Sequence, residues 1–180
     1  MRWIVVGAVL VLVTGCSAAA VPPPAPSAAV SSYNATDVAW LQLLIPMTEQ
    51  AVRLFDTVPE RTGNPQVVEV ARVMRGDHQS QLERLRELLR RSGNAETDIH
   101  DGHDLPGMVT PDDLVILGKV KERAFDRLFA VHVSEYLRQS VLVADGEQNS
   151  GADPDTKEFA ASMARSRQDE LGKLPRSDPS

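Results

Sequence analysis

Two histidines and three methionines stand where helical periodicity would place their side chains inside a helical protein. His78 and His132 both lie on apolar helical stripes, so they would face each other across a core. The thioethers of Met47, Met74 and Met163 recur at helical spacing and suit the soft ion Cu(I). The same residues also fit a hydrogen-bonded packing histidine and core-filling methionines. The sequence leaves both interpretations open.

A second group of candidate metal ligands lies in a segment rich in glycine and proline. His100 and His103 alternate with Asp101 and Asp104, and Met108 follows. Imidazoles and carboxylates at this spacing would hold Cu(II), Zn(II) or Ni(II) weakly. The alternative is a solvated polar loop without a ligand.

The sequence carries no constellation typical of an enzyme. A di-iron carboxylate site in a helical bundle requires Glu-x-x-His on two helices, and this motif is absent from the chain. His132-x-x-Glu135 has that spacing in the reverse order, and it occurs once. Gly-x-Ser-x-Gly and glycine-rich phosphate-binding motifs are absent as well. We therefore expect no enzymatic activity and no catalytic residue.

The single cysteine, Cys16, follows a segment typical of exported proteins. Met1 and Arg2 precede an apolar run from Trp3 to Val13, and Thr14-Gly15-Cys16 comes directly after it. An 11-residue helix spans about 17 Å, which is short of the roughly 30 Å hydrocarbon core of a bilayer. The order of residues resembles a bacterial lipobox, so we expect residues 1–15 to be a signal peptide and Cys16 to be acylated. An ordinary signal peptide with an incidental cysteine is the alternative.

Residues 16–35 have the composition of a tether. They are mainly alanine, proline and serine without apolar periodicity, and the prolines favour the extended polyproline II conformation. Two acyl chains on one residue give stable membrane attachment. The sequence thus predicts an exported protein, anchored by lipid on the extracytoplasmic face of the cell membrane.

Composition and charge limit the classes of partner that the protein could bind. The chain has 180 residues, of which 42% are hydrophobic and 24% charged, as in globular proteins. Its formal net charge of -6 would repel nucleic acid, so we expect no nucleic-acid partner. The expected partners are the membrane, through the lipid on Cys16, and an envelope protein; the pattern indicates no particular oligomeric state.

Two antiparallel helices are expected over residues 36–92. Thr36 is expected to cap the first, and Asn64-Pro65 is a typical start for the second. Thr110 precedes Pro111 and two acidic residues, which predicts another helix start. The helix that begins at Pro111 would either run through to Asp145 or break near Lys121.

The chain matches itself when it is shifted by 89 residues. Residues 37–85 then align with 126–174 without a gap, and 11 of the 49 pairs are identical. We read this as a duplicated helical hairpin, with repeat halves 37–92 and 126–174, a linker over 93–125 and a flexible tail over 175–180. Two hairpins packed face to face predict an all-α fold, a four-helix bundle over 36–174.

The centre of the sequence resembles a bacterial family known as domain of unknown function 305. The residues that carry the resemblance are Leu105-Pro106-Gly107-Met108, Thr110, Leu114 and Phe125-Asp126-Arg127-Leu128-Phe129, with a similar lead-in from Asp37 to Ala51. The resemblance implies a ferritin-like four-helix bundle that is often exported or lipid-anchored, with a His-His pair on the first helix of each half. This chain instead has Met47-Thr48 and Tyr136-Leu137 at those positions.

The loss of all four family histidines shapes the functional prediction. Without them, a family-type metal or redox site does not carry over to this chain. We therefore expect a lipid-anchored envelope bundle that serves as a non-enzymatic scaffold or partner-binding module and needs no cofactor. The alternative is an envelope copper-binding protein that uses the remaining histidines and methionines.

Overall fold

The computed structural model describes residues 32–100 and 103–174, and these residues form helices connected by turns and loops. The predicted all-α class is confirmed, since the described residues contain no strand. Cys16, the signal peptide, the tether up to residue 31 and the tail over 175–180 lie outside the described residues. The described residues form five α-helices and one 3-10 helix: α1 (Ala35–Thr57), η1 (Val58–Glu60), α2 (Pro65–Arg91), α3 (Pro111–Leu117), α4 (Glu122–Ser150) and α5 (Pro154–Lys173).

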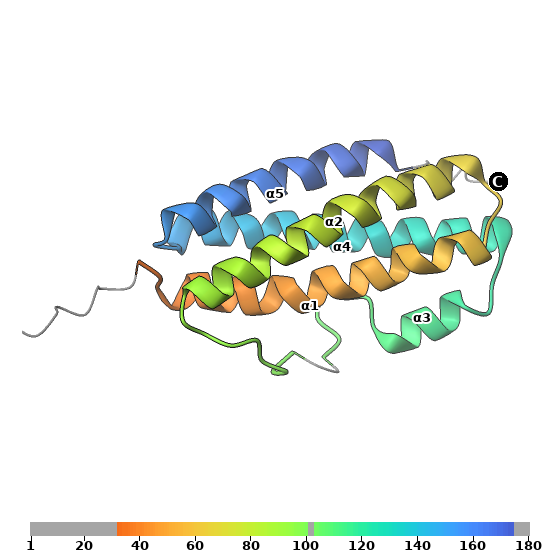
Figure 1. Ribbon diagram of the computed structural model, residues 1–180. Coiled ribbons are helices and arrows are strands. Elements are labelled where there is room, and N and C mark those ends of the chain that lie inside the picture. Colours follow the sequence, from red (N-terminus) through yellow and green to blue (C-terminus); the bar gives the residue numbers. More distant parts are fainter. Residues whose placement is uncertain (1–31, 101–102, 175–180) are drawn as a thin grey trace, which may run out of the picture. The chain divides into compact units, whose positions relative to one another are not determined.

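The four long helices pack in sequence-adjacent pairs. Helix α1 packs against α2, α4 packs against α5, and the two pairs meet where α1 contacts α4. Figure 1 shows these helices side by side, with the short α3 outside them; α3 contacts α4. One hydrophobic core cluster joins Leu54 of α1, Val67 of α2 and Phe129 of α4. The two hairpins therefore share apolar surface that neither could bury alone. Within the described residues, none of the helices is long and apolar enough to cross a membrane.

The start of α1 differs from the expected one. Asn34, not Thr36, is the N-cap: its side-chain oxygen accepts hydrogen bonds from the backbone N–H groups of Thr36 (2.8 Å) and Asp37 (3.0 Å). The Asp37 carboxylate in turn accepts from the Asn34 N–H at 2.6 Å. This reciprocal capping box satisfies more donors than a lone threonine cap would, which explains the earlier start.

The second helix of each hairpin begins in the same way. Asn64 caps α2 by accepting from Gln66 N–H, and Asp153 caps α5 by accepting from Thr156 N–H. Both caps precede a proline at the first helical position, where its missing N–H is not needed. The two caps are 89 residues apart in the sequence, as the self-alignment requires.

The segment between the hairpins breaks near Lys121. Helix α3 ends at Leu117, and Lys121 is the N-cap of α4, so α4 begins inside the expected linker over 93–125. The break is held by the turn that connects α1 to α2: Arg61 donates to the Gly118 carbonyl at 2.6 Å, and its own carbonyl accepts from Glu122 N–H at 2.8 Å. The expected cap at Thr110 is confirmed, since Thr110 and Asp113 form a capping box.

Candidate functional site

The four positions at which the family resemblance implies histidines lie inside the helical core. Met47 and Thr48 on α1 are buried, as are Tyr136 and Leu137 on α4. The Tyr136 hydroxyl donates to Thr48 Oγ1 at 3.5 Å, which links the two hairpins across the interior. Among these four residues, hydroxyl groups and a thioether therefore stand where imidazoles would be expected.

Two charged residues of α5 join this interior, and sequence reasoning did not select either of them. Arg167 is fully buried and Glu170 is 4% exposed. Arg167 Nη1 lies 3.3 Å from Glu170 Oε2, and its Nη2 donates to the Tyr136 hydroxyl at 3.1 Å. The guanidinium carbon also lies 5.4 Å from the centre of the Tyr136 ring, within the range of a cation–π contact. Glu170 accepts a further hydrogen bond from Ser166 Oγ at 3.1 Å.

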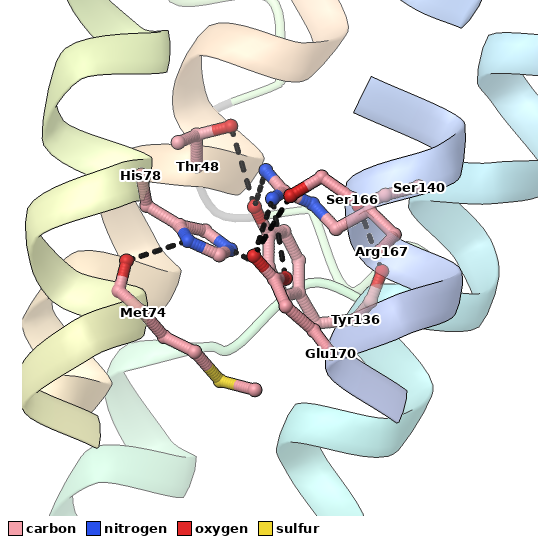
Figure 2. Close-up of polar contacts among 8 residues, drawn as sticks. All are labelled: Thr48, Met74, His78, Tyr136, Ser140, Ser166, Arg167 and Glu170. Atoms are coloured by element: carbon pink, nitrogen blue, oxygen red, sulfur yellow. Dashed lines mark hydrogen bonds and ion pairs between the residues drawn. The ribbon is translucent and has the colours of Figure 1, made fainter. Parts of the chain in front are cut away.

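His78 reaches the same cluster from α2, as Figure 2 shows. Its Nδ1 lies 2.7 Å from the carbonyl of Met74. A carbonyl oxygen only accepts, so Nδ1 carries the proton and Nε2 presents a lone pair. Nε2 has no hydrogen-bond partner and lies 3.7 Å from Glu170 Oε2. The imidazole also packs edge-on against Phe55, with ring centres 5.1 Å apart.

Burial controls the protonation of this cluster. Burial, followed by the positive charge of Arg167, lowers the pKa of His78 well below its usual value. Burial raises the pKa of Glu170, although Arg167 and the hydrogen bond from Ser166 act in the opposite direction. His78 is therefore neutral near pH 7, and its contact with Glu170 is not an ion pair. The ion pair in the cluster is the one between Glu170 and Arg167.

The chemical capacity of the cluster follows from these charges. A metal ion next to Glu170 would compete with the Arg167 guanidinium for the same carboxylate oxygens. Within residues 32–100 and 103–174, no group of three or more histidine, cysteine, aspartate or glutamate residues is arranged to hold a metal ion. The cluster does connect α1, α2, α4 and α5 through polar contacts in the core.

The predicted pairing of His78 with His132 is wrong. His132 is only half-buried, and it lines an outer groove between α4 and the loop that contains Gly107. The buried stripe of α4 runs through Val133, Tyr136 and Ser140. Successive residues of a helix are rotated by about 100°, so His132 lies at the edge of that stripe rather than on it.

The three methionines also do not converge. Met47 and Met74 belong to the core cluster around Phe129, whereas Met163 belongs to a second cluster around Trp40. His78, His132 and these thioethers therefore do not converge on one copper site, because they lie in separate parts of the fold.

The loop histidines do lie near each other. The rings of His100 and His103 have centres 6.2 Å apart, and His103 N–H donates to the His100 carbonyl at 3.2 Å. Asp101 lies outside the described residues. Met108 is buried in the core, where it is 5% exposed, so it is not part of an exposed ligand group.

A sequence signal for Arg167 exists in the internal repeat. The 89-residue shift pairs His78 with Arg167 and Gln81 with Glu170. His78 was already expected in the core, so its repeat partner should be there too. Arginine and glutamate are rarely buried unless they are paired, which is why the stripe alone did not indicate them.

The comparisons with known proteins agree on the fold. The model of the family described as Domain of unknown function (DUF305) matches residues 36–177. A crystal structure of a DUF305 protein from Streptomyces coelicolor, described as secreted, is 19% identical, with a TM-score of 0.69 over 77% of this chain and 89% of that chain.

The crystal structure of a DUF305 fragment from Deinococcus radiodurans is 16% identical, with a TM-score of 0.70 over 79% of this chain and 94% of that chain. None of the curated proteins compared with the chain matches it. Since the family model covers most of the sequence, and structures of the same family share its fold, this chain belongs to the DUF305 family.

Proposed function

We propose that the protein is a lipid-anchored component of the cell envelope whose ferritin-like four-helix bundle is a non-enzymatic, partner-binding module. The observation that carries the partner-binding role is the outer face of α4. Val131 and Leu142 on this helix are 49% and 63% exposed. Next to them, the loop Asp104–Met108 and α4 enclose a groove of about 540 Å³ that includes His132 and Leu142. Exposed apolar side chains beside a groove favour contact with another protein.

The loop that forms this groove is held in place by Gly107. Gly107 has a φ of +78°, and a Cβ atom at this position would lie 2.5 Å from Gln139 Cβ on α4. Glycine thus allows the loop to lie directly on the helix. Because the loop belongs to a stretch that carries the family resemblance, we propose that the groove is the partner surface.

The partner surface is tested by site-specific photo-crosslinking in the intact envelope. A crosslinking side chain at His132 should give a discrete adduct, and Leu142→Asp in the same chain should remove it. The matched control is the same crosslinker at Ser80, an exposed residue of α2, where no adduct of that size should form. Equal adducts at both positions, or an adduct insensitive to Leu142→Asp, would refute the proposal.

The lipid anchor is tested at Cys16. Cys16→Ala should block processing and move the protein out of the detergent phase on phase separation. Unchanged partitioning of this variant would contradict acylation. The proposal rests on the lipobox-like sequence, because Cys16 lies outside the described residues.

Copper binding remains a second candidate function, now at the loop rather than in the core. The observation that favours it is the shared turn of His100 and His103, whose ring centres lie 6.2 Å apart. Two imidazoles suit Cu(II). Titration of the purified chain with Cu(II) should show a visible d–d band that disappears in the His100→Ala/His103→Ala variant; an unchanged band in that variant would exclude this site.

A further inference from the structure

A groove between α2 and α5 has the size and lining of a small-molecule site. Its volume is about 380 Å³, and Val70, Val73 and Met74 of α2 form its apolar wall. Small-molecule sites in proteins commonly span about 300–1,000 Å³ and combine apolar walls with a few polar groups. This groove is separate from the outer groove of α4, because the two share no lining residue.

The rim of the groove carries carboxylates on both sides. Asp77 stands on α2 and Asp169 on α5, both exposed, and neither has an ion pair within the described part of the chain. Glu69 also lines the groove, but Arg72 neutralises it at 2.7 Å. Lys173 is the one cation among the described residues that line the groove. The unpaired charges at the rim are therefore two negative and one positive, which favours a cationic ligand.

The floor of the groove is formed by a buried carboxyl group that has a second acceptor behind it. Glu170 lines the groove from α5, although it is 4% exposed. Directly behind it, the unpartnered Nε2 of His78 lies 3.7 Å from Glu170 Oε2, as Figure 2 shows. The only proton of neutral His78 is committed to the Met74 carbonyl, so His78 has none to donate to Glu170. His78 is fully buried and does not line the groove, so the acceptor that a ligand can reach is Glu170. Glu170 already accepts from Arg167 and Ser166, but a carboxylate offers about four acceptor positions and can accept from a ligand N–H group as well.

We propose that this groove binds a small amphiphilic organic cation, that is, an amine with an apolar body. Its ammonium group lies at the floor and rim, near Glu170 and Asp77. Its apolar body lies along Val70, Val73 and Met74. An ammonium offers three N–H donors in addition to its charge, which matches the carboxylates at the floor and the rim.

Other ligand classes fit this groove less well. An anion would meet Asp77, Asp169 and Glu170. A bare metal ion would gain nothing from the apolar wall. A neutral molecule would fill the wall but leave the two rim carboxylates without a counter-charge. A compact cation with an apolar body can contact the apolar wall, the rim carboxylates and the carboxyl group at the floor.

The charge preference is tested with three phenylalkyl probes of similar size on the full chain, purified in a non-ionic detergent. The probes are 2-phenylethylamine, 2-phenylethanol and 3-phenylpropionate, and binding is measured by isothermal titration calorimetry at neutral pH. We expect the amine to bind at least about tenfold more tightly than the alcohol, and the anion not to bind, because each charge-assisted hydrogen bond is stronger than its neutral counterpart. Equal binding of amine and alcohol would overturn the proposal.

The location is tested with charge-removing variants. Asp77→Asn and Asp169→Asn, both at exposed positions, should each weaken amine binding about threefold, as expected for exposed charges. Glu170→Gln should weaken it about tenfold while keeping the size of the side chain. The matched control is Glu83→Gln, an exposed residue of α2 outside the groove, which should leave the affinity unchanged.

The exposed variants keep the test decisive if Glu170→Gln disturbs folding. An Asp77→Asn/Asp169→Asn double variant that binds the amine as tightly as Glu83→Gln would refute the site. Amine binding that weakens in the double variant and also falls with rising salt would support it, since salt screens exposed charges.

Discussion

His78 and Arg167 occupy equivalent positions in the two hairpins, 89 residues apart, and both side chains are fully buried against Glu170. His78 Nε2 lies 3.7 Å from Glu170 Oε2, and Arg167 Nη1 lies 3.3 Å from the same oxygen. The internal repeat thus places a neutral imidazole and a charged guanidinium beside the same carboxyl oxygen (Figure 2). An approximate symmetry of the sequence has produced an asymmetric polar centre.

The buried pair of Arg167 and Glu170 gives the first prediction. Arg167→Ala should lower the free energy of unfolding by about 3–5 kcal/mol, because it leaves a carboxyl group unpaired in the core. The double variant Arg167→Met/Glu170→Leu should recover a large part of this loss, since apolar residues of similar volume often replace a buried ion pair at little cost. Denaturant unfolding monitored by circular dichroism measures both.

The control for this prediction is Arg72→Ala. Arg72 pairs with Glu69 on the exposed side of α2, where the two side chains are 68% and 62% exposed. Its removal should change stability little, because exposed ion pairs contribute little. A double variant at Arg167 and Glu170 that is no more stable than Arg167→Ala would contradict the account of the buried pair.

The pair of Glu147 and Asp37 predicts a pH dependence of stability. Burial, followed by the nearby Asp37 carboxylate, raises the pKa of Glu147 to about 8. The pKa of glutamate in an unfolded chain is about 4.3, so the folded state binds more protons than the unfolded state between these values. This contribution to the free energy of unfolding is therefore complete below about pH 4 and is lost as pH rises through about 8.

Glu147→Gln should remove this dependence. We expect the variant to lose less stability than the parent chain between about pH 5 and pH 9, since the amide cannot ionise next to Asp37. Urea unfolding at several pH values measures the difference. Glu83→Gln, which makes the same charge change at an exposed site, should keep the slope of the parent; equal slopes for the parent and Glu147→Gln would show that Glu147 ionises normally.

The loop that lies on α4 predicts a contrast between two glycines. Gly107→Ala should destabilise the protein by about 1–3 kcal/mol, because φ is +78° and the new Cβ would lie 2.5 Å from Gln139 Cβ. Gly146 lies inside α4, and a Cβ there would have no atom within 4 Å. Gly146→Ala should therefore stabilise the protein by about 0.5–1 kcal/mol. Thermal unfolding of the two variants should shift in opposite directions; shifts in the same direction would contradict the packing described here.

The shared core predicts that one hairpin does not fold alone. Leu54 and Val67 of the first hairpin pack in the same cluster as Phe129 and Val133 of the second. A fragment of residues 36–93 should therefore aggregate, dimerise or lack fixed tertiary packing, as measured by analytical ultracentrifugation and near-ultraviolet circular dichroism. A stable, folded monomer of this fragment would show that each hairpin has its own core.

Local signals in the sequence are sufficient to predict the helices and most of the residues at which they begin and end. Apolar periodicity predicted the all-α class, and the caps at Asn64, Thr110 and Asp153 depend only on residues within one turn. Thr36 is a typical cap by residue type, but α1 starts two residues earlier than a Thr36 cap predicts, because Asn34 and Asp37 form a reciprocal capping box. The repeat and the family resemblance were likewise readable from residue order alone.

Tertiary structure decided which residues form the buried polar cluster around Glu170. His132 and His78 both lay on apolar stripes, yet a rotation of about 100° between neighbouring helical residues separates His132 from the buried face of α4. Arg167 and Glu170 are buried because α5 brings them to Tyr136 and His78, residues far away in the sequence. Helix formation depends on neighbours along the chain, whereas the groups that meet in the core depend on the rotation and offset of whole helices, which only their packing determines.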